Sequence, residues 1–121
     1  KAQQIVQSVI DSGQAFNVIY AENDDMAKGA VAALDKANIS HGGGKDVIVM
    51  GFDCNKWALE ELLNQNWNYD GQCNPYQASY IEDVIKKLES GEKIDEKTII
   101  MDEKGFDATT ITQDDVDQFG I

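Results

Sequence analysis

Three short polar segments of the sequence carry the side chains that could bind a ligand. They are residues 23–26 (Asn-Asp-Asp-Met), 51–53 (Gly-Phe-Asp) and 72–75 (Gln-Cys-Asn-Pro). Each falls where the sequence pattern predicts that a strand ends and a helix begins. In an open sheet of parallel strands this edge binds ligands, because loop side chains and helix N-termini converge there. Their amides and carboxylates can donate and accept hydrogen bonds, so the chemistry they offer is recognition of a polar ligand.

The same residue types give little support to catalysis. Asp24 and Asp25 resemble a catalytic carboxylate pair, but acidic residues in the first turn of a helix are favoured by the helix dipole without any reaction to perform. His41 is the only histidine, and its three following glycines predict an exposed position. A catalytic triad and a histidine-based metal site are therefore not expected. Residues 102–107 lack the ligand spacing of a calcium loop, so we expect no catalytic residue, metal or cofactor.

Composition limits the partners and the size of the protein. The 121 residues include 22 acidic and 10 basic side chains, giving a formal net charge of −12. Such a surface repels phosphate backbones and anionic lipid, so no nucleic-acid partner is expected. The length fits one small domain. The sequence begins at Lys1 without an initiator methionine, a signal peptide or a membrane-spanning apolar run, and we interpret it as a piece of a longer protein.

The hydrophobic period alternates between helix-like and strand-like along the chain. Asn23 or Asp24 can cap the second helix, Asn74 can cap the fourth with Pro75 in its first turn, and Thr112 with Asp115 resembles a capping box. The expected helices cover residues 2–10, 24–37, 57–63 and 75–90, with a short one after residue 112, and the expected strands cover residues 18–21, 47–50, 68–72 and 98–101. This order predicts an α/β fold, a three-layer α/β/α sandwich with a mainly parallel, Rossmann-like sheet.

Three of these segments, taken in order, resemble one protein family. Residues 18–30, 47–53 and 73–76 are similar to the C-terminal half of type 1 periplasmic sugar-binding proteins. The tail, residues 105–112, is similar to the galactofuranose-type members. The resemblance covers nearly the whole chain.

The resemblance implies the solute-binding component of an ABC-type carbohydrate importer, with no reaction catalysed. Its implied partners are a sugar, an N-terminal lobe of the same protein and the importer permease. It also implies an extracytoplasmic location, in the periplasm or lipid-anchored at the surface of a Gram-positive cell. Residues 1–74 would be the lobe core, residues 75–95 a helix packing on the N-terminal lobe, and residues 96–121 a returning strand and tail.

By the family pattern, Asn23 and Asp53 hydrogen-bond sugar hydroxyls; otherwise Asn23 is a helix cap and Asp53 a loop cap. In ribose-type relatives a glutamine immediately precedes the dipeptide aligned with residues 74–75, but here Cys73 holds that place and the glutamine is Gln72. Only one of the two can face the ligand from a regular strand, and we favour Gln72. Trp57 either faces a sugar ring or packs its helix on the sheet. Cys54 and Cys73 both follow strands, and they form either a disulfide or two free thiols.

Other classes of function remain open at this stage. A sugar-sensing domain of a LacI-type regulator, or of a chemotaxis or two-component sensor, would share the same core. An unrelated α/β enzyme or a receiver domain is a more distant alternative. The sequence does not name the sugar, and it leaves open whether the isolated chain forms a dimer.

Overall fold

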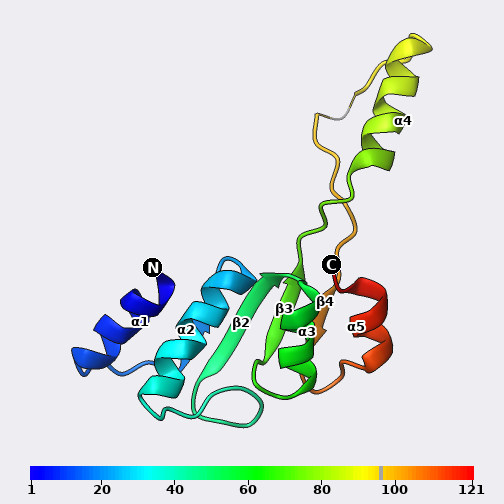
Figure 1. The fold of residues 1–121 in the computed structure, drawn as a ribbon. Helices are drawn as coiled ribbons and strands as arrows, with labels where there is room; N and C mark the ends of the chain where they lie inside the picture. The colour runs from blue at the N-terminus through cyan, green and yellow to red at the C-terminus, as the bar shows by residue number, and fades with distance from the viewer. Residues whose placement is uncertain (96) are drawn as a thin grey trace. The chain divides into compact units, whose positions relative to one another are not determined.

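Helices and strands alternate along the chain in the computed structural model, which describes residues 1–95 and 97–121 (Figure 1). Two units divide the chain, one of Lys1–Cys73 with Lys104–Ile121 and one of Asn74–Glu103. Glu96, the first residue of the predicted segment 96–121, lies outside the described residues. The elements are α1 (Ala2–Asp11), β1 (Val18–Tyr20), α2 (Asp24–Lys36), β2 (Ile48–Asp53), α3 (Lys56–Leu63), β3 (Tyr69–Gln72), α4 (Ala78–Glu89), β4 (Gly105–Asp107) and α5 (Gln113–Phe119).

The first unit contains a four-stranded sheet in the order β1-β2-β3-β4. β1 and β3 both pair in parallel with β2, and β4 pairs antiparallel with β3, with Asp70 opposite Phe106. The predicted α/β class and mainly parallel sheet are confirmed. The predicted strand at residues 98–101 is wrong, since the fourth strand is β4. The apolar run at 98–101 has strand propensity, but propensity forms a strand only where a partner completes the ladder, and here residues 105–107 meet β3.

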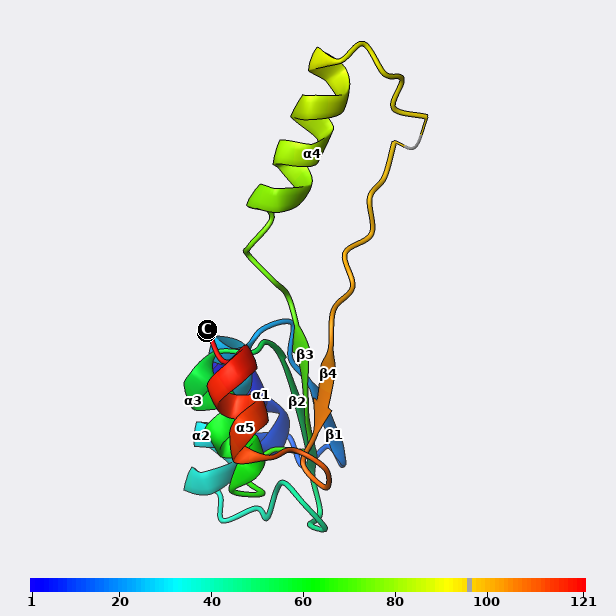
Figure 2. The ribbon, with the colours of Figure 1, turned by 90° about the vertical axis from the view of Figure 1, so that its right-hand side faces the viewer.

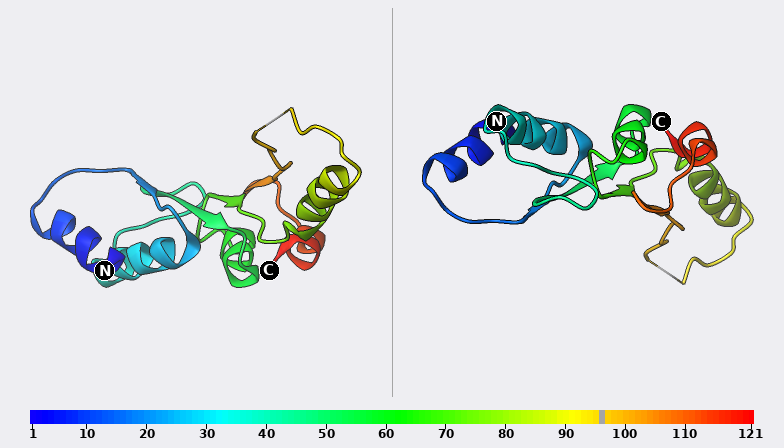
Figure 3. Two further views of the ribbon diagram at one scale, coloured as in Figure 1. Left: turned by 90° about the horizontal axis from the view of Figure 1, so that it is seen from above. Right: turned by 90° about the horizontal axis from the view of Figure 1, so that it is seen from below.

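The helices α2, α3 and α5 lie together on one face of this sheet (Figures 2 and 3). Between them and the sheet lies the core, which includes Leu34, Val49, Leu59, Trp67 and Val116. The described residues thus pack a layer of helices on a mainly parallel sheet, as the predicted α/β architecture requires.

The opposite face of the sheet carries three aromatic rings from neighbouring strands. Tyr20 of β1 and Phe52 of β2 have ring centroids 5.2 Å apart, and Phe52 lies 6.4 Å from Tyr69 of β3. Tyr20 remains exposed, because in the described structure no helix covers it. This face is therefore the less buried side of the sheet.

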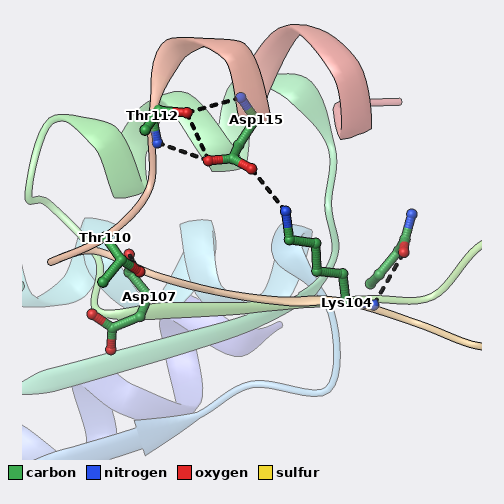
Figure 4. Close-up of polar contacts among 6 residues, drawn as sticks. Lys104, Asp107, Thr110, Thr112 and Asp115 are labelled. Carbon is green, nitrogen blue, oxygen red and sulfur yellow. Dashed lines mark hydrogen bonds and ion pairs between the residues drawn. The ribbon is translucent and has the colours of Figure 1, made fainter.

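Two helices of the first unit begin at the residues that the sequence indicated. Asn23 Oδ1 accepts a hydrogen bond from the Met26 N–H at 2.9 Å and caps α2. Thr112 and Asp115 form the predicted capping box of α5, whose Asp115 carboxylate also binds Lys104 Nζ at 2.8 Å (Figure 4). Side chains that bond the backbone three residues ahead are recognisable locally, which is why both starts were predictable.

The second unit contains α4, which begins later than expected. Asn74 Oδ1 accepts from the Tyr76 N–H, two residues ahead, at 2.8 Å, and this makes a turn instead of a helix cap. The helix therefore starts at Ala78, after Gln77, and Asn74 and Pro75 precede it. None of the helices within residues 1–95 and 97–121 combines the length and apolar character needed to cross a membrane.

Candidate functional site at the strand ends

Asp53 and Gln72 lie side by side where β2 and β3 end. They are paired in the parallel register, and both side chains are half-buried. The Gln72 amide oxygen accepts a hydrogen bond from the Lys104 N–H at 3.2 Å. Because this bond occupies the amide oxygen, the Gln72 NH2 group is oriented as a donor. The structure thus brings together two of the residues predicted for the site.

Asn23 follows the end of the neighbouring strand β1. The Ala21 N–H donates to the Met50 carbonyl at 3.0 Å and keeps this strand end against β2. The Asn23 amide oxygen is used in capping α2, so its Nδ2 is left to donate. Asn23, Asp53 and Gln72 therefore lie at the ends of three adjacent strands, and we call these three residues the rim.

The backbone that presents Asp53 is held in an uncommon conformation. Asp53 has φ 128° and Cys54 has φ 60°, in the region that side chains rarely adopt. The turn is fixed by the Asn55 N–H, which donates to Asp24 Oδ2 at 2.9 Å, and by Ile121, whose N–H donates to the Cys54 carbonyl at 3.1 Å. Strained backbone persists where surrounding contacts determine it, often at binding sites.

The rim combines donors with one negatively charged acceptor. Burial raises the pKa of Asp53, and the neighbouring Asp25 carboxylate raises it further. An ionised carboxylate accepts hydrogen bonds from two hydroxyls, while the two free amide groups donate. This donor and acceptor set matches a ligand rich in hydroxyl groups.

Trp57 lies in the helical layer and not with the rim. Its ring packs edge-on against Trp67 at 5.8 Å between centroids, and Lys28 Nζ lies 4.4 Å from the centre of the Trp57 ring. It lines a hollow of about 700 Å³ whose lining also includes His41 but none of the rim residues. These contacts support helix packing, the second of the two interpretations.

The surroundings of the two cysteines differ from those of a reactive site. Cys54 is buried, Cys73 is exposed and both are free thiols, so the structure holds no disulfide between them.

His41 was expected to be exposed, but this is wrong. Its Nδ1 lies 2.9 Å from the Asn66 carbonyl and its Nε2 lies 2.9 Å from Asp35 Oδ1. The imidazole lies between Asp35 of α2 and the segment after α3 that carries Asn66, so both nitrogens have partners.

Two buried acids near the rim were missed by the sequence reasoning. Asp24 and Asp70 are fully buried, although Asp24 had been interpreted as a cap or first-turn acid. The sequence contained a signal for Asp70, because alternation in a strand places its side chain on the opposite face of the sheet from its neighbours Tyr69 and Gly71. Within the described part of the chain, no three His, Cys, Asp or Glu side chains are grouped so as to hold a metal ion.

A family described as "Periplasmic binding protein domain" matches residues 1–93 of the chain. The fructose import binding protein FruE of Bifidobacterium longum is 30% identical over 112 residues, covering 91% of this chain and 33% of FruE. FruE is named as a binding protein.

Solved structures share the fold. A Mycobacterium smegmatis protein in complex with β-D-fucofuranose is 27% identical with a TM-score of 0.74, covering 89% of this chain and 34% of that one. A galactofuranose-binding protein has a TM-score of 0.81 at 21% identity, over 98% of this chain and 40% of that one, which shows the fold alone. The chain spans about a third of the length of FruE.

Proposed function

Since the chain belongs to the periplasmic binding protein domain family, we propose that it is part of a sugar receptor that serves an ABC-type importer. We further propose that Asn23, Asp53 and Gln72 hydrogen-bond the hydroxyls of the sugar. The observation that carries this proposal is the rim itself, where backbone bonds to the two amide oxygens leave two NH2 donors beside one carboxylate acceptor. The import role named for FruE and the furanose bound by the M. smegmatis protein support it.

Gln72 fits the third position better than Cys73. The amide of Gln72 is fixed by Lys104 with a free donor, whereas a thiol is a weak hydrogen-bonding group. We leave Trp57 out of the proposed ligand contacts, because Trp67 and Lys28 already lie against its ring. The proposed set is therefore polar throughout.

The second unit supports a role for part of the protein beyond this chain. Apolar side chains of α4, including Ile81, Ile85 and Leu88, are exposed. We propose that they pack on an N-terminal lobe which closes over the sugar, as the family resemblance implies. The importer permease and an extracytoplasmic location, in the periplasm or lipid-anchored at the cell surface, belong to the same proposal.

Tryptophan fluorescence of the whole protein tests sugar binding directly. We expect a saturable change with one member of a panel of pentoses, hexoses and furanose sugars, because Trp57 lies close to the turn that carries Asp53 in the sequence. Asp53→Asn keeps the shape of the side chain but removes the charged acceptor, and it should weaken binding about 10- to 100-fold. Silence across the panel in a folded protein would contradict the sugar assignment.

Asn23 needs a variant that separates binding from capping. Asn23→Ser keeps an N-cap oxygen but removes the amide donor, so affinity should fall while stability changes little. Thr112→Ala is the matched control, because it removes a cap from α5, which carries no rim residue, and should reduce stability without reducing affinity. Unchanged affinity in both Asn23→Ser and Asp53→Asn would overturn the assignment of the rim. Cells that lack the protein should lose uptake of the sugar if the protein serves an importer, and they should keep it if the protein is a sensor.

A further inference from the structure

Asp24 and Asp70 form a buried pair directly behind the rim. Asp24 Oδ2 accepts from the Asn55 N–H at 2.9 Å and from Asn55 Nδ2 at 3.0 Å. The other oxygen of Asp24, Oδ1, and Oδ2 of Asp70 are buried without a hydrogen-bond partner among residues 1–95 and 97–121. The side chains of both residues are fully buried. Buried oxygens without a partner are costly, so this arrangement requires an explanation.

The geometry brings the two carboxyl groups together, because Gly51 is paired in register with Asp70 and a Cβ atom at position 51 would lie 2.6 Å from Asp24 Oδ1. Each carboxyl group acts on the pKa of the other. Two ionised carboxylates can only accept hydrogen bonds, so they cannot bond to each other. A single proton placed between them turns one group into a donor and gives both unpartnered oxygens a bond. Like-charged neighbours that are also desolvated retain such a proton far above the usual range.

The backbone around the pair leaves room for this contact. Gly51 is paired in register with Asp70, and a Cβ atom at position 51 would lie 2.6 Å from Asp24 Oδ1 and 2.7 Å from the Trp67 ring. The Asp24 carboxyl thus lies in the space that any larger residue at position 51 would occupy. Glycine at this position permits the close approach of α2 to the sheet.

We propose that Asp24 and Asp70 share one proton, and that this proton-linked pair is a positioning device for the rim. Asp24 follows Asn23 directly, its partner Asn55 lies two residues after Asp53, and Asp70 lies two residues before Gln72. The shared proton therefore joins the three strand ends that carry the proposed ligand contacts. The part of this inference that concerns ligand affinity rests on the proposed function.

The surroundings of the pair are acidic. The titratable groups that act on it are Asp53, at the end of β2, and Cys54, whose Sγ lies 3.9 Å from Asp70 Oδ1. Burial raises the pKa of the Cys54 thiol, which keeps it a donor to Asp70. Burial, followed by the Asp24 charge, raises the pKa of Asp70 to about 8. Burial also raises the pKa of Asp24, against the lowering effect of Asn55.

The sign of the pH effect follows from this shift. The folded protein binds a proton that the unfolded chain releases near the usual aspartate pKa of 3.8. The stabilisation is complete below that value and is lost as the pH rises toward about 8. As the pH rises from about 5 to about 7, this one group should raise the ratio of unfolded to folded protein about tenfold per pH unit.

The first test measures the proton itself in the whole protein, without sugar. Infrared spectroscopy at neutral pH should show the carbonyl band of a protonated carboxylic acid, and the band should disappear as the pH rises past about 8. The band should be absent in Asp70→Asn. A wild-type spectrum without the band at neutral pH would overturn the proposal, whether or not the variant folds.

The second test compares the pH dependence of unfolding by denaturant. Asp70→Asn donates an N–H where the shared proton was, so it should lack the tenfold change per pH unit that the wild type shows. Asp25→Asn is the matched control, because it removes an exposed acid next to Asp24 and should keep the wild-type slope. Equal slopes in wild type and Asp70→Asn would overturn the proposal.

The third test connects the pair to the rim. Using the sugar identified by the fluorescence panel, affinity should fall above about pH 8 in the wild type and stay constant in Asp70→Asn. Parallel loss of affinity in both proteins would reject the positioning role. The infrared band without any sugar binding would reject the proposed function and retain the pair, whereas sugar binding without the band would reject the pair alone.

Discussion

At the scale of single residues, Gly51 shows how one missing side chain shapes the binding region. Gly51→Ala would place a methyl group against the buried Asp24 carboxyl and the Trp67 ring, neither of which can move freely. Overpacking of this kind should lower the free energy of unfolding by about 1–3 kcal/mol, measured by denaturant unfolding.

Gly71→Ala is the comparison for this prediction. Its Cβ atom would lie 2.6 Å from the ring of Phe52, a half-buried side chain on the open face of the sheet. Because Phe52 is only half-buried whereas Asp24 is fully buried, we expect a smaller loss of stability than for Gly51→Ala. The reverse order would show that the region around Asp24 is looser than its burial indicates.

At the scale of elements, α5 is anchored by a small polar cluster at its start. Thr112 Oγ1 accepts from the Asp115 N–H, and the Asp115 carboxylate accepts from the Thr112 N–H at 3.0 Å and from Lys104 Nζ (Figure 4). Thr112→Ala removes one side of this capping box and should cost about 1 kcal/mol of stability. Denaturant unfolding near neutral pH measures it.

The same cluster predicts a response to acid. The hydrogen bond from Lys104, followed by that from Thr112, lowers the pKa of Asp115 to about 2. A lowered carboxylate pKa stabilises the folded state above the usual aspartate range, and that contribution is lost as the pH falls toward about 2. Amide hydrogen exchange in α5 should therefore speed up in acid. Asp115→Asn should be less sensitive, and equal acid sensitivity would contradict the assignment.

At the scale of the whole molecule, the edge strand β1 governs whether the isolated chain should self-associate. Val18 and Tyr20 of β1 are 48% and 64% exposed, and β1 pairs with a strand on one side only in the described sheet. An unpaired, apolar edge strand promotes association. The 121-residue chain alone should therefore self-associate with rising concentration, which sedimentation analysis measures.

Val18→Lys should reduce this association, because a charge on an edge strand opposes pairing. Ile5→Lys is the control, since Ile5 is an exposed apolar residue of α1 and lies outside the sheet. Equal effects of the two variants would point to general hydrophobicity instead of the strand edge.

The sequence by itself determined the features that depend on neighbours a few residues apart. The cap at Asn23, the box at Thr112 and the period of the helices are local, so the α/β class and these helix starts could be predicted. The choice of the rim residues rested on the family resemblance, and their role in binding stays a prediction. The strand at 98–101 and the exposure of His41 were predicted wrongly, because each was decided by a partner that the local pattern does not contain. The cap at Asn74 was also wrong, because its amide oxygen accepts from the Tyr76 N–H two residues ahead and makes a turn.

Only the tertiary structure revealed the pair behind the rim. Asp24 and Asp70 are separated by 46 positions, and their contact needs Gly51 between them and Asn55 beside them. In the sequence, each is an ordinary aspartate at a helix start or in a weak strand. Burial changes their chemistry, because an ionised carboxylate that loses water must find a donor or keep a proton.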